Sequence, residues 1–146
     1  MGEGPEETTI RKQIHQIGLL DRVLMLGYRD DSLSVLRSLD LFVMPSIEGD
    51  IIPQVLFEAM AVGLPVIATT TTGSIPDVIH DGITELLVPP RDSLTMGRHI
   101  EKLLTDNVLA RLLGHKAFQL VMQAYSLEAM LNRLEQVYRN VMAQRR

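Results

Sequence analysis

The chain has 146 residues, of which 46% are hydrophobic and 22% are charged, and this is the composition of a single folded domain. Cysteine is absent, which excludes disulfides and thiolate metal sites, and no apolar run approaches the ~18 residues of a membrane span. The net charge of −4 and the aromatic content of 4% argue against nucleic acid as a partner.

Hydrophobic spacing predicts helices and short strands that alternate along the chain. Ile10, Ile14 and Ile17 recur at helical spacing and predict a first helix over Glu6–Gly18. The other expected helices are Ser32–Ser38, Val55–Val62, Ser93–Leu104, Val108–Gln123 and Leu127–Ala143, with N-caps at Ser93 and Ser126. Short apolar runs predict four buried strands at Val23–Leu26, Leu41–Met44, Val66–Ala68 and Leu86–Val88.

These strands are apolar throughout rather than alternating, which indicates burial on both faces. Short apolar strands between helices are typical of parallel βαβ units. We therefore expect an α/β fold in one domain, residues 1–146, with about four parallel strands flanked by helices and a helical C-terminal part from about residue 107.

Ligands of open parallel sheets bind outside the carboxyl ends of the strands. One such end, Ser46–Pro53, leads into a helix N-terminus, which favours a phosphate, and it carries Glu48 and Asp50. Glu58 interrupts an apolar stretch and therefore needs a partner or a polar ligand. Taken alone, these acidic residues fit helix capping or solvation better than ligand binding.

A longer series of motifs changes that weighting. In order, the segments are Leu41–Ser46, Glu58–Thr69, Gly73–Asp77, Asp81–Thr84 and Leu86–Pro90. They closely resemble the Rossmann-like, nucleotide-sugar-binding half of the family 4 (group 1) retaining glycosyltransferases, which have the two-domain GT-B fold. The resemblance implies transfer of a sugar from a UDP- or GDP-linked donor to an unknown acceptor, without a metal or other cofactor, in the cytoplasm.

The resemblance also implies roles for individual residues. Asp50 and Glu58 are separated by seven residues, as the family's acidic pair is, and we expect them to be catalytic by contacting the donor's sugar and ribose. The other expected donor contacts are Ile51, Ile52 and Pro53 beside the sugar and phosphates, Val55 beside the ribose, and Tyr28 and Arg29 beside the base.

Some residues depart from the family pattern. Asp50 stands where glutamate is usual, which shortens its reach by one methylene. Ile51, Ser74 and Glu85 stand where glycine is common. At Glu85 a glycine could be meeting a backbone demand that glutamate meets poorly.

The start of the chain, Gly2–Pro5, resembles the glycine turn after the family's second strand. The chain is then truncated at its N-terminal side and lacks the diphosphate-binding basic pair and the acceptor domain. We expect it to be inactive alone, with exposed strand edges closed by its own strands, by self-association or by the missing half of the enzyme. The alternative is a non-catalytic remnant, or a partner half that supplies a binding surface or completes a split enzyme. The basic C-terminal residues leave contact with the inner face of the membrane open.

Overall fold

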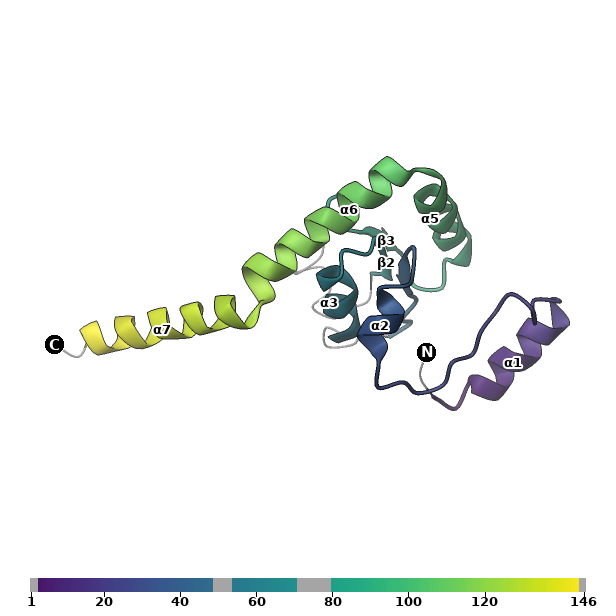
Figure 1. Ribbon diagram of the computed structural model, residues 1–146, viewed down its shortest axis with the longest axis horizontal. Coiled ribbons are helices and arrows are strands. Elements are labelled where there is room, and N and C mark those ends of the chain that lie inside the picture. The colour runs from purple at the N-terminus through teal and green to yellow at the C-terminus, as the bar shows by residue number, and fades with distance from the viewer. Residues whose placement is uncertain (1–2, 49–53, 71–79, 145–146) are drawn as a thin grey trace. The chain divides into compact units, whose positions relative to one another are not determined.

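The computed structural model describes residues 3–48, 54–70 and 80–144, and the chain divides into two compact units, residues 1–32 and 33–146. The first unit contains α1 (Glu7–Gln16). The second contains the sheet and the helices around it, apart from Ser32 at the start of α2 (Figure 1). Its elements in chain order are α2 (Ser32–Leu36), β1 (Phe42–Met44), α3 (Gln54–Ala61), β2 (Val66–Thr69), β3 (Leu86–Val88), α5 (Ser93–Thr105), α6 (Asn107–Leu120), the π-helical η1 (Val121–Tyr125) and α7 (Leu127–Gln144).

The sheet is parallel and confirms the expected α/β class. Its three described strands lie in the order β1-β2-β3, with Met44 opposite Ala68 and Ile67 opposite Leu86. The prediction of a strand at Val23–Leu26 is wrong, because this segment forms no strand. A strand exists only by pairing, and within the described residues this apolar run has no ladder partner.

Helices cover both faces of the sheet, as the uninterrupted apolar strands predicted. Val66 and Ala68 point to one face, where Leu56 and Met60 of α3 and Ala117 of α6 complete the core. Ile67 points to the other face and packs with residues of β3, α5 and α6, namely Leu86, Val88, Leu103 and Leu113. The side chains of β2 are buried on both faces, which makes this strand the centre of the unit.

α3 ends at a glycine, as its sequence predicted. Gly63 has φ +79°, its N–H donates to the Met60 carbonyl, and the Leu64 N–H donates to the Ala59 carbonyl. This pair of bonds is the Schellman motif, which favours glycine because of the left-handed φ. The Gly63 carbonyl then lies directly under Gly114 of α6, where a Cβ would stand 2.2 Å from the carbonyl oxygen. α6 can therefore approach the turn between α3 and β2 only because residue 114 has no side chain.

Two N-caps were predicted, and one of them is wrong. Ser126 caps α7 as expected, since its hydroxyl accepts from the Ala129 N–H at 3.2 Å. The cap of α5 is Asp92 rather than Ser93, because the Asp92 carboxylate accepts from both the N–H and the hydroxyl of Thr95. These two bonds hold the pKa of Asp92 below its usual value.

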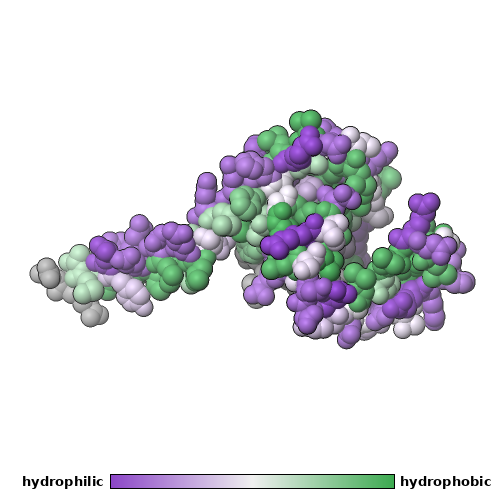
Figure 2. Space-filling view, in the orientation of Figure 1, coloured by the Kyte–Doolittle hydropathy of each residue, from purple (hydrophilic) through white to green (hydrophobic). Residues whose placement is uncertain are grey.

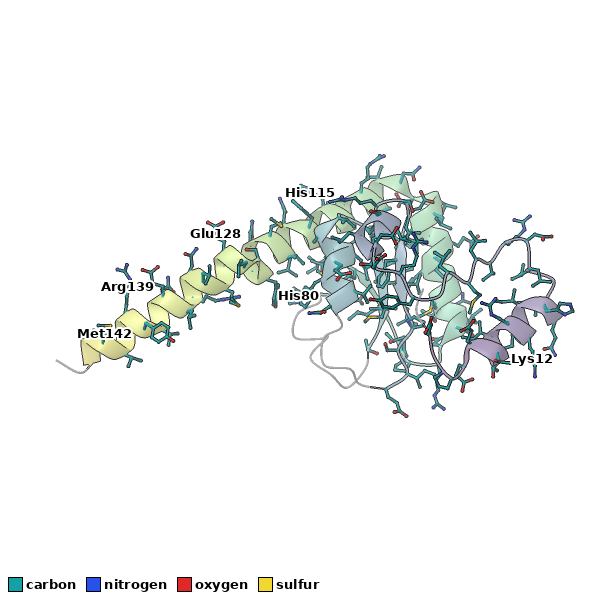
Figure 3. The ribbon with its side chains drawn as sticks, turned by 60° about the horizontal axis from the view of Figure 1, so that its bottom comes forward. Lys12, His80, His115, Glu128, Arg139 and Met142 are labelled. Atoms are coloured by element: carbon teal, nitrogen blue, oxygen red, sulfur yellow. The ribbon has the colours of Figure 1, made fainter. Side chains whose placement is uncertain are left out.

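α7 packs against η1 and otherwise presents a largely exposed surface (Figures 1 and 2). Large apolar side chains recur along it at helical spacing, and these are Leu127, Met130, Leu131, Leu134, Val137, Tyr138, Val141 and Met142. Charged residues lie among them, and Figure 3 labels Glu128 and Arg139 along the same helix. Arg139 pairs with Glu135 one turn earlier.

The contact between Gly63 and Gly114 predicts a paired effect of adding one methyl group. Gly114→Ala should lower the free energy of unfolding by about 1–3 kcal/mol, because α6 must move away from the Gly63 carbonyl. Gly97→Ala, in α5, should raise it by up to about 1 kcal/mol, because an added Cβ there meets nothing within 4 Å and alanine favours the helix. Urea unfolding of both variants measures this, and equal effects of the two substitutions would contradict it.

Candidate functional site

The expected donor contacts are only partly within the described residues. Asp50, Ile51, Ile52 and Pro53 lie outside them. Val55 and Glu58 lie in the first two turns of α3, and both are half-buried. A half-buried carboxylate on an otherwise apolar helix agrees with the expectation that Glu58 faces a polar group.

Tyr28 and Arg29 belong to the unit formed by residues 1–32, whereas α3 belongs to the other unit. The Tyr28 side chain is 76% exposed. The Arg29 guanidinium donates to both carboxylate oxygens of Asp31, at 2.6 and 2.5 Å, and this pairing raises the pKa of Arg29 and lowers that of Asp31. That Tyr28 and Arg29 join Glu58 in one site stays a prediction.

The carboxyl ends of all three strands meet at one edge of the sheet. A cavity of about 170 Å³ lies there, lined by Pro45, Ile47, Thr69, Arg91, Asp92, Ser93 and Met96. Residues at or just after the end of each strand line the cavity. This is the edge at which an α/β sheet binds its ligand.

Thr69 joins two of these strand ends. From the sequence, the threonine run Thr69–Thr72 is interpreted as a strand end rather than as a phosphate contact, and this link is not predicted. It is the last residue of β2 and is 2% exposed, and its hydroxyl donates to the Ser46 carbonyl at 2.6 Å. Ser46 lies just after β1, so a side chain of β2 holds the exit of the neighbouring strand β1. The sequence signal for the burial of Thr69 is its place directly after the fully apolar run of β2.

Arg91 is the one described residue other than glycine with a positive φ, at 67°. An L side chain in this region is strained by about 1–2 kcal/mol. The position lies between Pro90 and the cap Asp92, where the chain turns from β3 into α5. Glu85 has no positive φ, so a left-handed backbone is not a demand that glycine would meet at position 85.

Glu85 conflicts with its position for a different reason. Its side chain is fully buried, and neither carboxylate oxygen has a hydrogen-bond partner within the described structure. Burial raises the pKa of Glu85 to about 8. In the register of the sheet Glu85 lies one residue before the pair Ile67–Leu86, at the amino edge and away from the candidate site.

The described residues do not form a metal site. They contain no group of three histidine, aspartate or glutamate side chains that could hold a metal ion. Over residues 3–48, 54–70 and 80–144, every helix is too short or too polar to serve as a membrane span.

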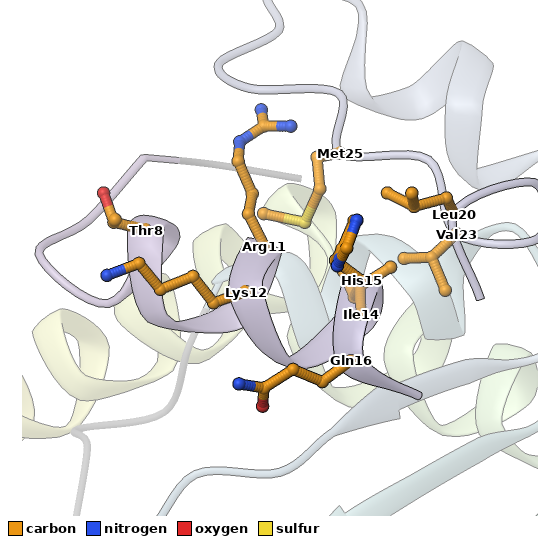
Figure 4. Close-up of a pocket in the computed structure, with 9 residues that line it drawn as sticks. All are labelled: Thr8, Arg11, Lys12, Ile14, His15, Gln16, Leu20, Val23 and Met25. Carbon is orange, nitrogen blue, oxygen red and sulfur yellow. The ribbon is translucent and has the colours of Figure 1, made fainter. Parts of the chain in front are cut away.

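A separate cavity of about 530 Å³ lies within the unit formed by residues 1–32 (Figure 4). Apolar side chains of α1 and the following segment line it together with Arg11, Lys12 and His15. The Arg11 guanidinium is paired with Glu7 at 2.8 Å. None of the expected donor contacts lines this cavity.

Comparisons with known proteins agree with this geometry. Residues 1–106 match the family described as glycosyl transferases group 1. N-acetyl-alpha-D-glucosaminyl L-malate synthase of Bacillus anthracis is 34% identical over 142 residues, which are 97% of this chain and 37% of that protein. Alpha-D-kanosaminyltransferase of Streptomyces kanamyceticus is 31% identical over 142 residues, 96% of this chain and 36% of that protein.

Solved structures show the same fold. Sucrose-phosphate synthase of Thermosynechococcus elongatus superimposes with a TM-score of 0.81 at 31% identity, over 98% of this chain and 37% of that one. The Anabaena protein HepE, in complex with UDP, superimposes with a TM-score of 0.87 at 22% identity, over 95% of this chain and 39% of that one.

The fold is therefore that of the α/β unit of GT-B glycosyltransferases. The chain belongs to the glycosyl transferases group 1. It spans just over a third of the length of the relatives named above.

The buried Glu85 predicts a stability that falls as pH rises. Its pKa is about 8 in the folded chain and 4.5 as the ordinary value, so the folded state retains a proton between these values that the unfolded state loses. The contribution is fully present below pH 4.5 and is lost by about pH 8, a change of up to about 5 kcal/mol.

Glu85→Gln should remove this part of the pH dependence and should be more stable than the native chain above pH 8. Urea unfolding at pH 5 and at pH 8.5 measures it, with Glu101→Gln as a control that removes one exposed carboxylate from α5. An unchanged difference between the two pH values in Glu85→Gln would contradict the assignment.

Proposed function

We propose that this chain is the donor-binding part of a retaining, metal-independent glycosyltransferase of family 4, which moves a sugar from a nucleotide-diphosphate sugar to an acceptor. The observation that carries the proposal is the family match over residues 1–106, because it spans both Asp50 and Glu58. The half-buried position of Glu58 on α3, the helix that follows β1, supports a role in donor binding.

The proposed chemistry requires little of the chain beyond binding and charge stabilisation. The bond between the sugar's anomeric carbon and a diphosphate oxygen breaks, and a bond to the oxygen of an acceptor hydroxyl forms on the same face of the ring. The hydroxyl's proton passes to the departing diphosphate. Negative charge develops on the departing diphosphate, where backbone N–H groups at a helix N-terminus are stabilising. In this proposal Asp50 and Glu58 orient the donor through its hydroxyl groups.

UDP is the donor nucleotide that the comparisons support first. HepE was solved with UDP and with UDP-glucose, and the Staphylococcus aureus protein TarM was solved in complex with UDP. We propose a UDP- or GDP-linked donor for this chain and a cytoplasmic site of action, where such donors are made. Contact with the inner face of the membrane stays a prediction.

The chain spans just over a third of its relatives, and we propose that it binds the donor without transferring the sugar when alone. The same observation favours the second candidate, a partner half that supplies a binding surface or completes a split enzyme. Donor binding without transfer is expected of both candidates. If transfer is restored when the protein that supplies the acceptor domain is added, the chain is the active half of an enzyme rather than a remnant.

Donor binding is tested by titrating the chain with UDP and with GDP in a calorimeter. We expect one of the two to bind, and we expect Glu58→Gln to weaken it by about tenfold, because one charge-assisted hydrogen bond to the ribose is lost. Asp50→Asn should leave the binding of UDP or GDP unchanged, because the contact expected of Asp50 is with the sugar that these nucleotides lack. Glu101→Gln, which removes an exposed carboxylate from α5, should bind as the native chain does. Failure of the native chain to bind either nucleotide at millimolar concentration would overturn the proposal.

Self-association is the second part of the proposal. Within the described residues β1 pairs with β2 alone, so the backbone groups on its other side have no strand partner, and such edges favour pairing between chains. We expect sedimentation equilibrium of the isolated chain at micromolar concentration to show a dimer or larger species. A monomer across that range would contradict self-association and leave the donor-binding proposal intact.

A further inference from the structure

We infer that Thr69 is a positioning residue for the donor site, because its hydroxyl holds the exit of β1 against the end of β2. The inference rests on the proposed donor binding and goes beyond it, since Thr69 is not one of the expected donor contacts. It is carried by the geometry of two strand ends that the structure describes.

The backbone ladder ends before this place. Phe42 donates its N–H to the Pro65 carbonyl, so Phe42 and Met44 are the residues of β1 whose N–H groups face β2. Met44 and Ala68 are the last partners in the ladder between β1 and β2. Among the described residues, the link between the two strands beyond that point is a side-chain bond.

Thr69 supplies a hydrogen-bond donor at this place. Its hydroxyl lies 2.6 Å from the Ser46 carbonyl oxygen and 3.5 Å from that of Met44, so the bond to Ser46 is the effective one. Since the Thr69 side chain is buried, its hydroxyl is shielded from water, and the bond fixes the direction in which the chain leaves β1.

The position of this bond gives it a functional consequence. Ser46 lies in the segment that connects β1 to α3, and α3 is the helix that carries Val55 and Glu58. Thr69 and Ile47 also line the cavity of about 170 Å³ at the carboxyl edge of the sheet. The Thr69 hydroxyl sets the relative position of the ends of β1 and β2, and a ligand bound at this edge contacts both. Loss of the hydroxyl should therefore weaken nucleotide binding as well as lower stability.

The test compares Thr69→Val, Thr69→Ser and Thr84→Val by UDP titration and thermal unfolding. Valine keeps the shape of threonine and removes the hydroxyl, and serine retains the hydroxyl. Thr84 is the matched control, because it is 4% exposed and its hydroxyl bonds to the backbone of His80, before β3 and at the opposite edge of the sheet.

We expect Thr69→Val to bind UDP about five- to tenfold more weakly, Thr69→Ser to restore most of the affinity, and Thr84→Val to lose thermal stability with unchanged affinity. Equal UDP affinity in Thr69→Val and the native chain, measured well below both unfolding temperatures, would overturn the inference while leaving the proposed function standing. Absence of UDP and GDP binding by the native chain would overturn both.

Discussion

The burial of β2 on both faces is the constraint on which the rest of the unit depends. A parallel strand that is buried on both faces needs helices above and below it, and the crossovers that supply those helices place the carboxyl ends of the strands at one edge. α3 is such a crossover, and it leads from the exit of β1 to the start of β2. The candidate site is therefore located by the same connection that buries the core.

Close packing of this kind leaves little freedom at the ends of β3, where two side chains conflict with their positions. Glu85 brings a carboxylate into a fully buried place, and burial favours its protonated form. Arg91 adopts a left-handed backbone at the turn into α5. The two residues lie on either side of the strand rather than within it, so β3 itself keeps an apolar core while the turns around it carry the conflict.

Much of this arrangement follows from the sequence because its causes are local. Apolar runs specified the three paired strands, Gly63 specified the end of α3, and Ser126 specified the cap of α7. The misassigned features have causes outside their own segments. Val23–Leu26 has the pattern of a strand without a partner. The cap of α5 is the exception, because its cause is local: the Asp92 carboxylate accepts two hydrogen bonds from Thr95. The burial of Glu85 depends on its surroundings, and the link from Thr69 to Ser46 joins residues 23 positions apart.

The carboxyl edge of the sheet is also where side chains replace backbone ladder bonds. The Thr69 hydroxyl bonds to the exit of β1, and the Asp92 carboxylate closes the turn that leads from β3 into α5. The last backbone bond at this edge joins the Thr70 N–H to the Val88 carbonyl. An edge that binds a ligand must end its ladder there, because strands that continued would fill the crevice. Polar side chains then hold the strand ends in place and leave the remaining backbone groups free to face a polar ligand. The distribution of short hydroxyl and carboxylate residues after β1, β2 and β3 is thus a physical requirement of a site at this edge, independent of which sugar or nucleotide occupies it.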